Sequence, residues 1–388
     1  MKLRNLLVVF KWVKKSKYVT DGLDARDPQG KGSAMFRPFS LFGFGEQKMF
    51  QPVMFVTGAT GMVGSCVVRR ALSAGFRVRA LVRPRTDLRA LEELPVETVQ
   101  GDLAEPSSLE NVLSGVDVVV HTAAHVGDWG PAEKYRAINV IALEHLLTAA
   151  RREGRLKRWI QVSSLGVYPA RHHYGTDESE IVDLQGLDGY TRTKAEAEVI
   201  VNQHIRQHQL PAVIVRPGFI YGLGDRHVVP RLAERLRAGK MWLIGSGNRL
   251  LNNTYVGNLV DAIMLSIQRE QVLGQTVNIR DGRLVTRKEF IGAIADFLKV
   301  PHPRSIPEWV ARSLVRPVEG WARLRSAGEA PIITQARIKF MTLNLEFSIE
   351  KAQSLLGYNP SVDFQEGIKE SLSGSVATDD TSETSAAA

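Results

Sequence analysis

The feature that most constrains this chain of 388 residues is a glycine-rich turn between an apolar strand and a helix. The apolar run Val53–Val56 leads into Thr57–Gly64, which has glycines at positions 58, 61 and 64. In such a turn the first glycine allows a tight bend, the second lets a pyrophosphate approach the backbone, and the third lets the helix pack on the sheet. The free N–H groups at the start of the helix attract phosphate. The residues predicted to hold a dinucleotide here are Gly58, Thr60, Gly61, Met62, Val63 and Gly64.

Apolar strands and helices alternate after this turn. A helix is predicted from about Met62 to Ala74, and further strands are predicted at 76–82, 96–99, 116–120, 159–162 and 212–215. This alternation predicts an α/β fold with a Rossmann-type, doubly wound parallel sheet that helices cover on both faces. Beyond about residue 222 the alternation weakens, which suggests a smaller C-terminal substrate-binding lobe interleaved with the core. The predicted parts are a basic N-terminal extension at 1–50, the dinucleotide-binding core at 51–222, the lobe at 223–370 and a disordered tail at 371–388.

The net charge of +9 does not indicate a nucleic-acid-binding protein. Residues 1–48 hold ten Lys or Arg and four acidic residues, so this segment carries +6 of the total. The rest of the chain offers no concentrated basic stripe for phosphates. The single cysteine, Cys66, cannot form an internal disulfide and favours a cytoplasmic location. No Cys/His/Asp spacing of a zinc site is present, so no metal is expected.

Two segments of the sequence are compatible with a peripheral membrane contact. The apolar stretch 6–10 is too short for a signal peptide or a membrane span. With its flanking lysines it is compatible with a basic amphipathic helix, although an upstream extension before Met49 is favoured. In residues 309–325, apolar side chains lie near one helical stripe between arginines, and a helix packed on its own protein is favoured there, with a kink at Pro317. The expected location is cytoplasmic, with membrane association as the alternative, and a homodimer stays open.

The end of the second strand should select the cofactor. An acidic residue there accepts hydrogen bonds from the ribose hydroxyls of NAD, whereas an arginine accommodates the 2′-phosphate of NADP. This chain has Arg83 after the strand and no carboxylate before Asp87. Because arginine grips phosphate through charge-assisted hydrogen bonds, NADP(H) is favoured and NAD(H) stays open. Asp102, followed by Leu103, is a candidate for the adenine amino group, with an ordinary turn aspartate as the alternative.

A tyrosine and a lysine one helical turn apart are candidate catalytic groups. Tyr190 and Lys194 are i and i+4, so they share a helix face. A phenol with a pKa near 10 is a poor proton shuttle at neutral pH, and a nearby ammonium should lower that pKa. Ser164 closes the fifth strand at the edge where open α/β sheets bind ligands, and its hydroxyl can hold a substrate oxygen as charge develops there. Together these residues predict hydride transfer with a nicotinamide cofactor.

Several motifs resemble the extended short-chain dehydrogenase/reductases over about residues 53–370. They are Thr57–Gly64, His121–Ala124, Ser163–Tyr168, Tyr190–Lys194 and Arg216–Gly222. Thr254–Val260 resembles the 3β-hydroxysteroid and sterol dehydrogenase branch of this NAD-dependent epimerase/dehydratase-like family, and Gly127–Gly130 is similar to loops in bacterial reductases of 2-alkyl-3-oxoalkanoic acids. The resemblance implies catalysis by Ser164, Tyr190 and Lys194, and a supporting role for Asn139 at the start of a helix. The cofactor contacts that it implies are Thr122, Ala123, Ala124, Asn139, Tyr190, Lys194 and Pro217. The substrate contacts that it implies are Trp129, Ser164 and Tyr221.

The favoured function is that of an NAD(P)-dependent oxidoreductase that interconverts a secondary alcohol and a ketone on an apolar substrate, a sterol-like ring or a 3-oxoacyl chain. The alternative is a nucleotide-sugar epimerase or dehydratase, which would use the same three residues with a tightly held cofactor. Such enzymes usually carry Asp where this chain has Asn258, which weakens that alternative. Steroid dehydrogenases of this type usually have an acid where Arg83 stands. A third hypothesis, a non-catalytic cofactor-binding sensor, usually goes with a broken catalytic triad, and here the triad is intact.

Overall fold

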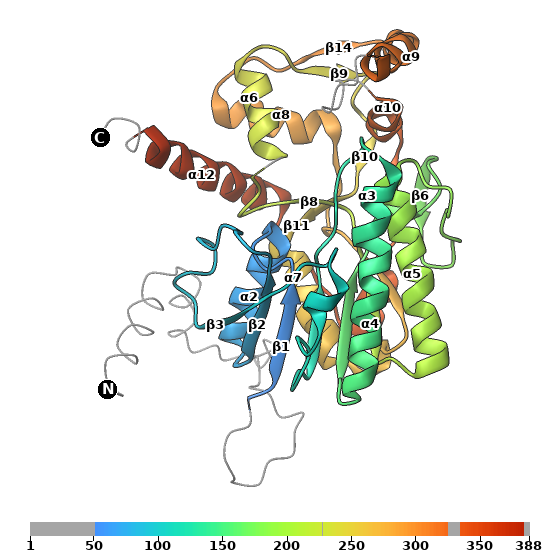
Figure 1. Ribbon diagram of the computed structural model, residues 1–388. Helices are drawn as coiled ribbons and strands as arrows, with labels where there is room; N and C mark the ends of the chain where they lie inside the picture. Colours follow the sequence, from blue (N-terminus) through green and yellow to red (C-terminus); the bar gives the residue numbers. More distant parts are fainter. Residues whose placement is uncertain (1–50, 227, 325–333, 384–388) are drawn as a thin grey trace, which may run out of the picture. The chain divides into compact units, whose positions relative to one another are not determined.

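A seven-stranded parallel sheet forms the centre of the fold in the computed structural model (Figure 1), which describes residues 51–383 apart from 227 and 325–333. Its strands stand in the order β12-β7-β5-β4-β1-β2-β3. Their bounds in chain order are β1 Val53–Thr57, β2 Arg77–Val82, β3 Val96–Gln100, β4 Val118–His121, β5 Arg158–Val162, β7 Ala212–Pro217 and β12 Thr276–Ile279. The predicted Rossmann-type, doubly wound sheet is confirmed. The predicted N-terminal extension lies outside the described residues.

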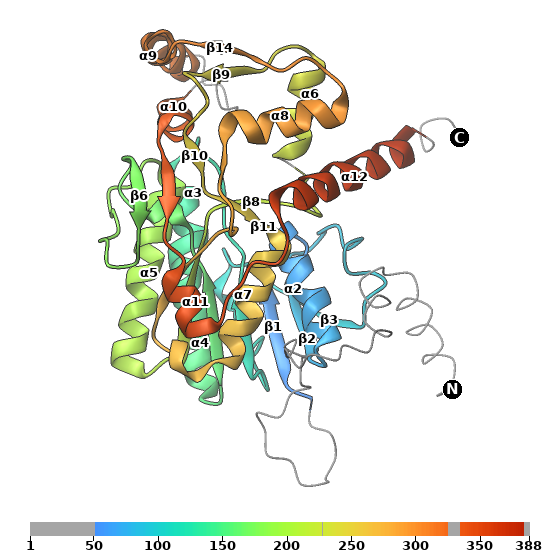
Figure 2. The same cartoon turned by 180° about the vertical axis from the view of Figure 1, so that it is seen from behind.

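Helices cover both faces of this sheet, as the apolar strands require. The helices α4 (Ala142–Glu153) and α5 (Gly189–His208) lie on the face seen in Figure 1, whereas α7 (Val256–Gln268) and α11 (Glu350–Leu356) lie on the face seen in Figure 2. The predicted helix after the glycine turn, α2 (Met62–Ser73), packs against α7. Between the sheet and α4, buried apolar residues of both form one core cluster.

The topology of the sheet determines where a ligand can lie. The chain runs from β1 outward through β2 to β3, and then returns to place β4 on the other side of β1. Open α/β sheets bind ligands beyond the carboxyl ends of their strands at such a switch point. The predicted cofactor and catalytic residues lie at or after the carboxyl ends of β1, β2, β3, β4, β5 and β7, so the fold brings these segments to one edge.

The C-terminal half builds a second layer of elements around its own apolar cluster. Three short strand pairs contribute: β8 (Phe219–Tyr221) with β11 (Asn253–Tyr255), β9 (Trp242–Ile244) with β14 (Arg304–Ile306), and β10 (Leu250–Leu251) with β13 (Val285–Thr286). A fourth pair, β6 (His173–Thr176) with β15 (Leu345–Phe347), adjoins a separate apolar cluster. The helices of this half are α6 (Val229–Arg237), α8 (Arg287–Leu298), α9 (Glu308–Leu324), α10 (Gln335–Thr342) and α12 (Phe364–Glu383). The boundary of this lobe at residue 222 stays a prediction.

The C-terminal end of the chain differs from its prediction. A disordered tail was expected from residue 371, but α12 continues through Glu383. Phe364, Ile368 and Leu372 recur at helical spacing and are buried in the cluster of the C-terminal half, so burial of this face extends the helix past the predicted boundary. Residues 384–388 lie outside the described residues.

The helix α9 presents two different faces. Ala311 and Val315 are buried against Ile338 of α10, as the favoured prediction of a helix packed on its own protein requires. On the outer side Trp309 and Trp321 are exposed. Among the described residues, every helix is too short or too polar to span a bilayer.

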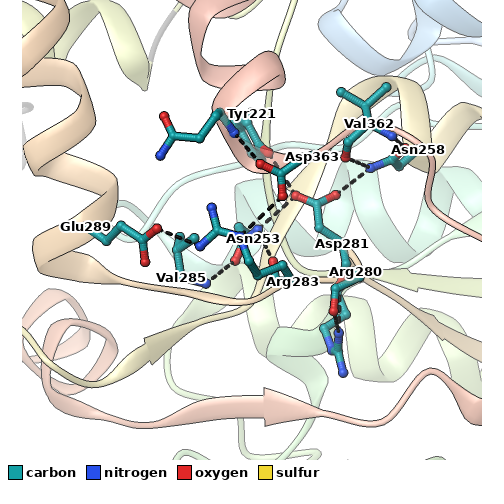
Figure 3. Close-up of polar contacts among 12 residues, drawn as sticks. Tyr221, Asn253, Asn258, Arg280, Asp281, Arg283, Val285, Glu289, Val362 and Asp363 are labelled. Atoms are coloured by element: carbon teal, nitrogen blue, oxygen red, sulfur yellow. Dashed lines mark hydrogen bonds and ion pairs between the residues drawn. The ribbon is translucent and has the colours of Figure 1, made fainter.

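A buried aspartate ties the end of the sheet to the C-terminal half (Figure 3). Asp281 lies just beyond β12 and is 1% exposed. One of its carboxylate oxygens accepts hydrogen bonds from Tyr255 N and Asn258 Nδ2, each at 2.8 Å. The other accepts from the Tyr221 hydroxyl and from Asn253 Nδ2, each at 2.9 Å. This single side chain therefore satisfies four donors that are removed from water.

We expect Asp281→Ala to destabilise the protein by about 4 kcal/mol or more, because each buried donor left without an acceptor costs about 1–3 kcal/mol. Urea unfolding followed by circular dichroism measures the difference. The matched control is Asp296→Ala, since Asp296 is an exposed aspartate paired with His302, and it should change the free energy of unfolding by less than about 1 kcal/mol. Equal stabilities of the two variants would contradict the role given to Asp281.

Candidate active site

The glycine turn has the geometry that its sequence predicts. Gly58 has φ +68°, and Gly61 N donates to Gly58 O at 3.0 Å, which closes the turn. A Cβ added to Gly64 would lie 2.1 Å from Gly58 O, so the start of α2 packs directly on the turn. Gly61 is exposed at the N-terminus of α2, where backbone N–H groups face outward. Met62 and Val63 direct their side chains toward the C-terminal cluster.

The end of β4 lies directly against this turn. Thr122 Oγ1 donates to Thr57 O at 2.7 Å, and Ala123 N donates to Thr57 Oγ1 at 3.2 Å. A Cβ on Gly58 would approach both Thr122 and Ala123 within 2.9 Å, so the predicted cofactor residues of the two strands converge. His121 is buried beneath them and bonds Thr57 through Nδ1. Burial and the nearby Lys194 lower the pKa of His121 to about 3, which makes it a neutral framework residue.

The predicted adenosine side of the site is more open. Arg83 is exposed just past β2. Asp87, the next carboxylate along the chain, is bound by Arg89, and the hydrogen bonds from Arg89 hold the pKa of Asp87 at about 2. Asp102 Oδ1 accepts from Ala104 N at 2.9 Å, which is the bonding of a turn aspartate. The side chain of Leu103, which was also predicted to contact the cofactor, belongs to the core, and the contact stays a prediction.

The first turn of α5 carries two of the three catalytic candidates. Asp188 caps the helix by accepting from Thr191 N at 2.8 Å, and this cap sets the start of the helix. Tyr190 therefore lies in the first turn, with Lys194 one turn later and its ammonium nitrogen 5.9 Å from the centre of the Tyr190 ring. Ser164 follows β5, its Oγ accepts a hydrogen bond from Gly166 N at 3.0 Å, and it lies near enough to Tyr190 to lower the pKa of the phenol. The structure thus brings Ser164, Tyr190 and Lys194 together.

The pKa of Tyr190 differs from the expected one in its direction of shift. Burial raises the pKa of Tyr190 to about 12, against the opposing effect of the Ser164 hydrogen bond. Burial also lowers the pKa of Lys194 to about 8, while Glu198 raises it. The Lys194 ammonium donates to Val162 O at 2.7 Å. The expected lowering of the phenol pKa is therefore wrong for the protein alone, because the cost of burying a phenolate dominates.

Asn139 joins the loop after β4 to α5 through hydrogen bonds of its amide. It lies in a π-helical turn, Ala137–Ile141, between α3 (Ala132–Arg136) and α4, rather than at the start of a helix as predicted. Its Oδ1 accepts from His125 N at 2.7 Å, and its Nδ2 donates to His125 O and to Thr193 Oγ1. Asn139 is 4% exposed and its amide is bonded to protein groups, which fits the supporting role, while its contact with the cofactor stays a prediction.

The loop after β4 is fastened to the C-terminal half by contacts that sequence reasoning missed. Asp128 accepts from Arg337 Nη2 at 2.9 Å, from Arg337 Nε at 2.6 Å and from Thr334 Oγ1 at 3.1 Å. The carbonyl of Trp129 accepts from the Tyr135 hydroxyl at 2.9 Å. Nothing in the local sequence signals a bond between residues 209 positions apart. Trp129, a predicted substrate contact, is thus held in a loop with both a local and a distant attachment.

One predicted substrate contact is wrong. Tyr221 is 0% exposed, and its hydroxyl donates to Asp281. Aromatic rings of Tyr255, Phe290 and Phe364 surround it, because β8 pairs with β11 inside the cluster of the C-terminal half. Pro217, a predicted cofactor contact, closes β7 at the ligand-binding edge and is buried.

A cavity of about 550 Å³ lies between α8 and α12, and the residues that line it include none of those predicted for cofactor, substrate or catalysis. Among the described residues, no cluster of His, Cys, Asp and Glu could hold a metal ion.

Comparisons with known proteins identify the family of this chain. The sequence profile of the NAD dependent epimerase/dehydratase family matches residues 54–279. A 2-alkyl-3-oxoalkanoate reductase from Shewanella oneidensis is 30% identical over 329 residues, which cover 81% of this chain and 84% of the relative. A decarboxylating sterol-4-alpha-carboxylate 3-dehydrogenase from Candida albicans is 30% identical over 323 residues, covering 76% of this chain and 88% of the relative. The crystal structure of gox2253 has a TM-score of 0.71 at 27% identity, and the match covers 84% of this chain and 98% of that one.

The matched profile spans more than half of the chain. The relatives carry the names of reductases and dehydrogenases, which agrees with the hydride-transfer chemistry predicted from the catalytic residues. The chain therefore belongs to the NAD dependent epimerase/dehydratase family, within the extended short-chain dehydrogenase/reductases, and is an NAD(P)-dependent oxidoreductase.

Proposed function

We propose that this protein reduces the ketone of an apolar substrate to a secondary alcohol, with Tyr190 as the proton donor. The observation that carries the proposal is the convergence of Ser164, Tyr190 and Lys194 at the sheet edge that also holds the glycine turn. A bound reduced nicotinamide would supply the hydride that attacks the carbonyl carbon. The glycine turn and the N-terminus of α2 would hold its pyrophosphate.

Each catalytic side chain then has a separate task. Ser164, which lies beside Tyr190, would orient the carbonyl oxygen and donate to it as negative charge develops. Tyr190 would give its phenolic proton to that oxygen, and the ammonium of Lys194 would stabilise the phenolate that remains. A pKa of about 12 keeps Tyr190 protonated at neutral pH, so the phenol carries the proton that ketone reduction consumes.

The substrate class rests on the relatives and on the loop after β4. Relatives act, by their names, on 2-alkyl-3-oxoalkanoates and on sterol carboxylates, and both substrates carry large apolar parts. Trp129 in the fastened loop would supply an apolar wall, since sites for lipid-like ligands are lined mainly by such side chains. The second candidate, a nucleotide-sugar epimerase or dehydratase, is favoured by the name of the matched family.

Cofactor oxidation with a panel of ketones tests this proposal. Purified protein should oxidise NADPH in the presence of 3-oxoacyl or 3-ketosteroid compounds, and UDP- or GDP-sugars should leave its melting temperature unchanged. A sugar nucleotide that raised the melting temperature at micromolar concentration would instead support the epimerase, because only a ligand bound to the folded state stabilises it by mass action.

The choice of cofactor is a separate prediction. Because Arg83 is an exposed cation where NAD-binding folds of this type usually have an acid, we expect a higher kcat/KM for NADPH than for NADH. Arg83→Asp should lower kcat/KM for NADPH on the order of 10- to 100-fold through the loss of a charge-assisted hydrogen bond. Arg77→Asp, at the opposite end of β2, is the control and should leave the preference unchanged. A wild-type preference for NADH would refute this role of Arg83.

A further inference from the structure

A buried ion pair lies directly behind the catalytic residues. Glu198 and Arg216 are 1% and 5% exposed. Arg216 Nε donates to Glu198 Oε1 at 2.9 Å, and Arg216 Nη2 donates to Glu198 Oε2 at 2.6 Å. Ser163 Oγ donates to the same Oε1 at 2.5 Å. Both carboxylate oxygens of Glu198 are therefore held in fixed directions.

The hydrogen bonds that fix the Glu198 carboxylate continue across the sheet. Arg216 Nη1 donates to the Tyr168 hydroxyl at 2.7 Å, which in turn donates to Asn278 Oδ1 at 2.8 Å. Arg216 lies on β7 and Asn278 is its paired residue on β12. Since every polar group in this chain of bonds has a partner, the Glu198 carboxylate has a rigid support.

Three consecutive residues at the end of β5 lie against three residues on one face of α5. Val162 O accepts from the Lys194 ammonium and Ser163 donates to Glu198, while Ser164 lies near enough to Tyr190 to lower its pKa. Glu198 is one helical turn beyond Lys194, as Lys194 is one turn beyond Tyr190. The contact between Ser163 and Glu198 therefore joins the end of β5 to α5, the two elements that position Ser164, Tyr190 and Lys194.

A buried ion pair is weak support for stability, because the cost of removing two charges from water often exceeds their attraction. The position of this pair points to another role. We propose that Glu198, fixed by Arg216 and Ser163, is a positioning residue that holds the Lys194 ammonium and the end of β5 in register for proton transfer by Tyr190. This inference rests on the proposed ketone reduction.

The charged groups around Lys194 support this assignment. On α5 itself Tyr190 and Glu198 flank it, His121 faces it from β4, and Arg216 on β7 lies behind Glu198. His121 is neutral, since its pKa is lowered to about 3. Glu198 raises the pKa of Lys194 against the effect of burial, so its carboxylate favours the charged lysine.

The test compares Glu198→Gln with Glu196→Gln in the full chain. Glu196 lies on the same helix but pairs with Arg136 and Arg192 at the surface, which makes it the matched control. Glu198→Gln keeps the size of the side chain and removes the charge that raises the pKa of Lys194. The pH at which Lys194 loses its proton should therefore fall. It is measured by ¹³C NMR of lysine-labelled protein, with the Lys194 signal assigned through Lys194→Arg.

The same shift should appear in catalysis. We expect kcat of Glu198→Gln to fall on the order of 10- to 100-fold at pH 8, with KM nearly unchanged and a smaller loss at lower pH, where Lys194 stays charged. A purely structural role would lower kcat equally at all pH values. Should Glu198→Gln fail to fold with an unpaired Arg216, the double variant Glu198→Gln/Arg216→Met removes both charges and should show the same direction of change.

The outcomes separate the two proposals. An unchanged Lys194 midpoint in the variants without the Glu198 carboxylate would overturn the positioning role, whatever the wild-type activity. A lowered midpoint together with the pH-dependent loss of kcat would support it. A wild-type protein that reduces none of the ketones would count against the proposed function, while the NMR titration would still decide whether Glu198 acts on Lys194.

Discussion

Tyr190→Phe is expected to lower turnover by at least about 10²-fold, because it removes the proton that the carbonyl oxygen must receive. The phenyl ring keeps the packing of the first turn of α5, so the affinity for the nicotinamide cofactor should stay within about threefold of wild type. Steady-state rates with a ketone substrate and titration of cofactor fluorescence measure the two quantities.

The control for this variant is Tyr174→Phe. Tyr174 is 68% exposed on β6, and the loss of its hydroxyl should change neither turnover nor cofactor affinity. Turnover of Tyr190→Phe within a few-fold of wild type would show that another group supplies the proton.

Gly64→Ala is expected to abolish cofactor binding, with an affinity loss of at least about 100-fold, or about 2.7 kcal/mol. The added Cβ would lie 2.1 Å from Gly58 O and 2.9 Å from the Cα of Ala59. Both are backbone atoms, so the turn must move, and its N–H groups would no longer converge on a pyrophosphate. Isothermal titration calorimetry with NADPH measures the affinity.

Gly320→Ala is the matched control for this substitution. Gly320 lies in α9, and nothing lies within 4 Å of a Cβ added there. Alanine also favours a helix more than glycine does, so this variant should bind the cofactor as wild type does and be at least as stable. Retained affinity in Gly64→Ala would mean that the pyrophosphate lies elsewhere.

Local sequence patterns predicted the parts of the site that depend on short-range geometry. The glycine spacing gives a turn whose backbone conformation few other residues allow, and the i, i+4 spacing of Tyr190 and Lys194 fixes a shared helix face. Ser164 could be placed because an apolar strand of a parallel sheet ends at the ligand-binding edge. Such predictions need no knowledge of distant contacts.

The predictions from sequence failed where contacts between residues far apart in the chain determine how a side chain is oriented or buried. Tyr221 looked like a site residue from its motif, yet Asp281, 60 positions away, takes its hydroxyl into the core. The amide of Asn139 is turned toward His125 and Thr193 by a π-helical turn that has no clear sequence signal. The phenol pKa depends on burial, which the spacing of two residues does not reveal. In each case tertiary structure overrides a local pattern.

The bond between Asp128 and Arg337 has a consequence for how such an enzyme diversifies. The conformation of the loop that carries Trp129 thereby depends on α10, which contributes none of the proposed catalytic residues. On the proposal that Trp129 touches the substrate, mutation of α10 offers an evolutionary route to new substrates that leaves hydride transfer intact. Selection can then act on substrate preference and on hydride transfer through different segments of the sequence.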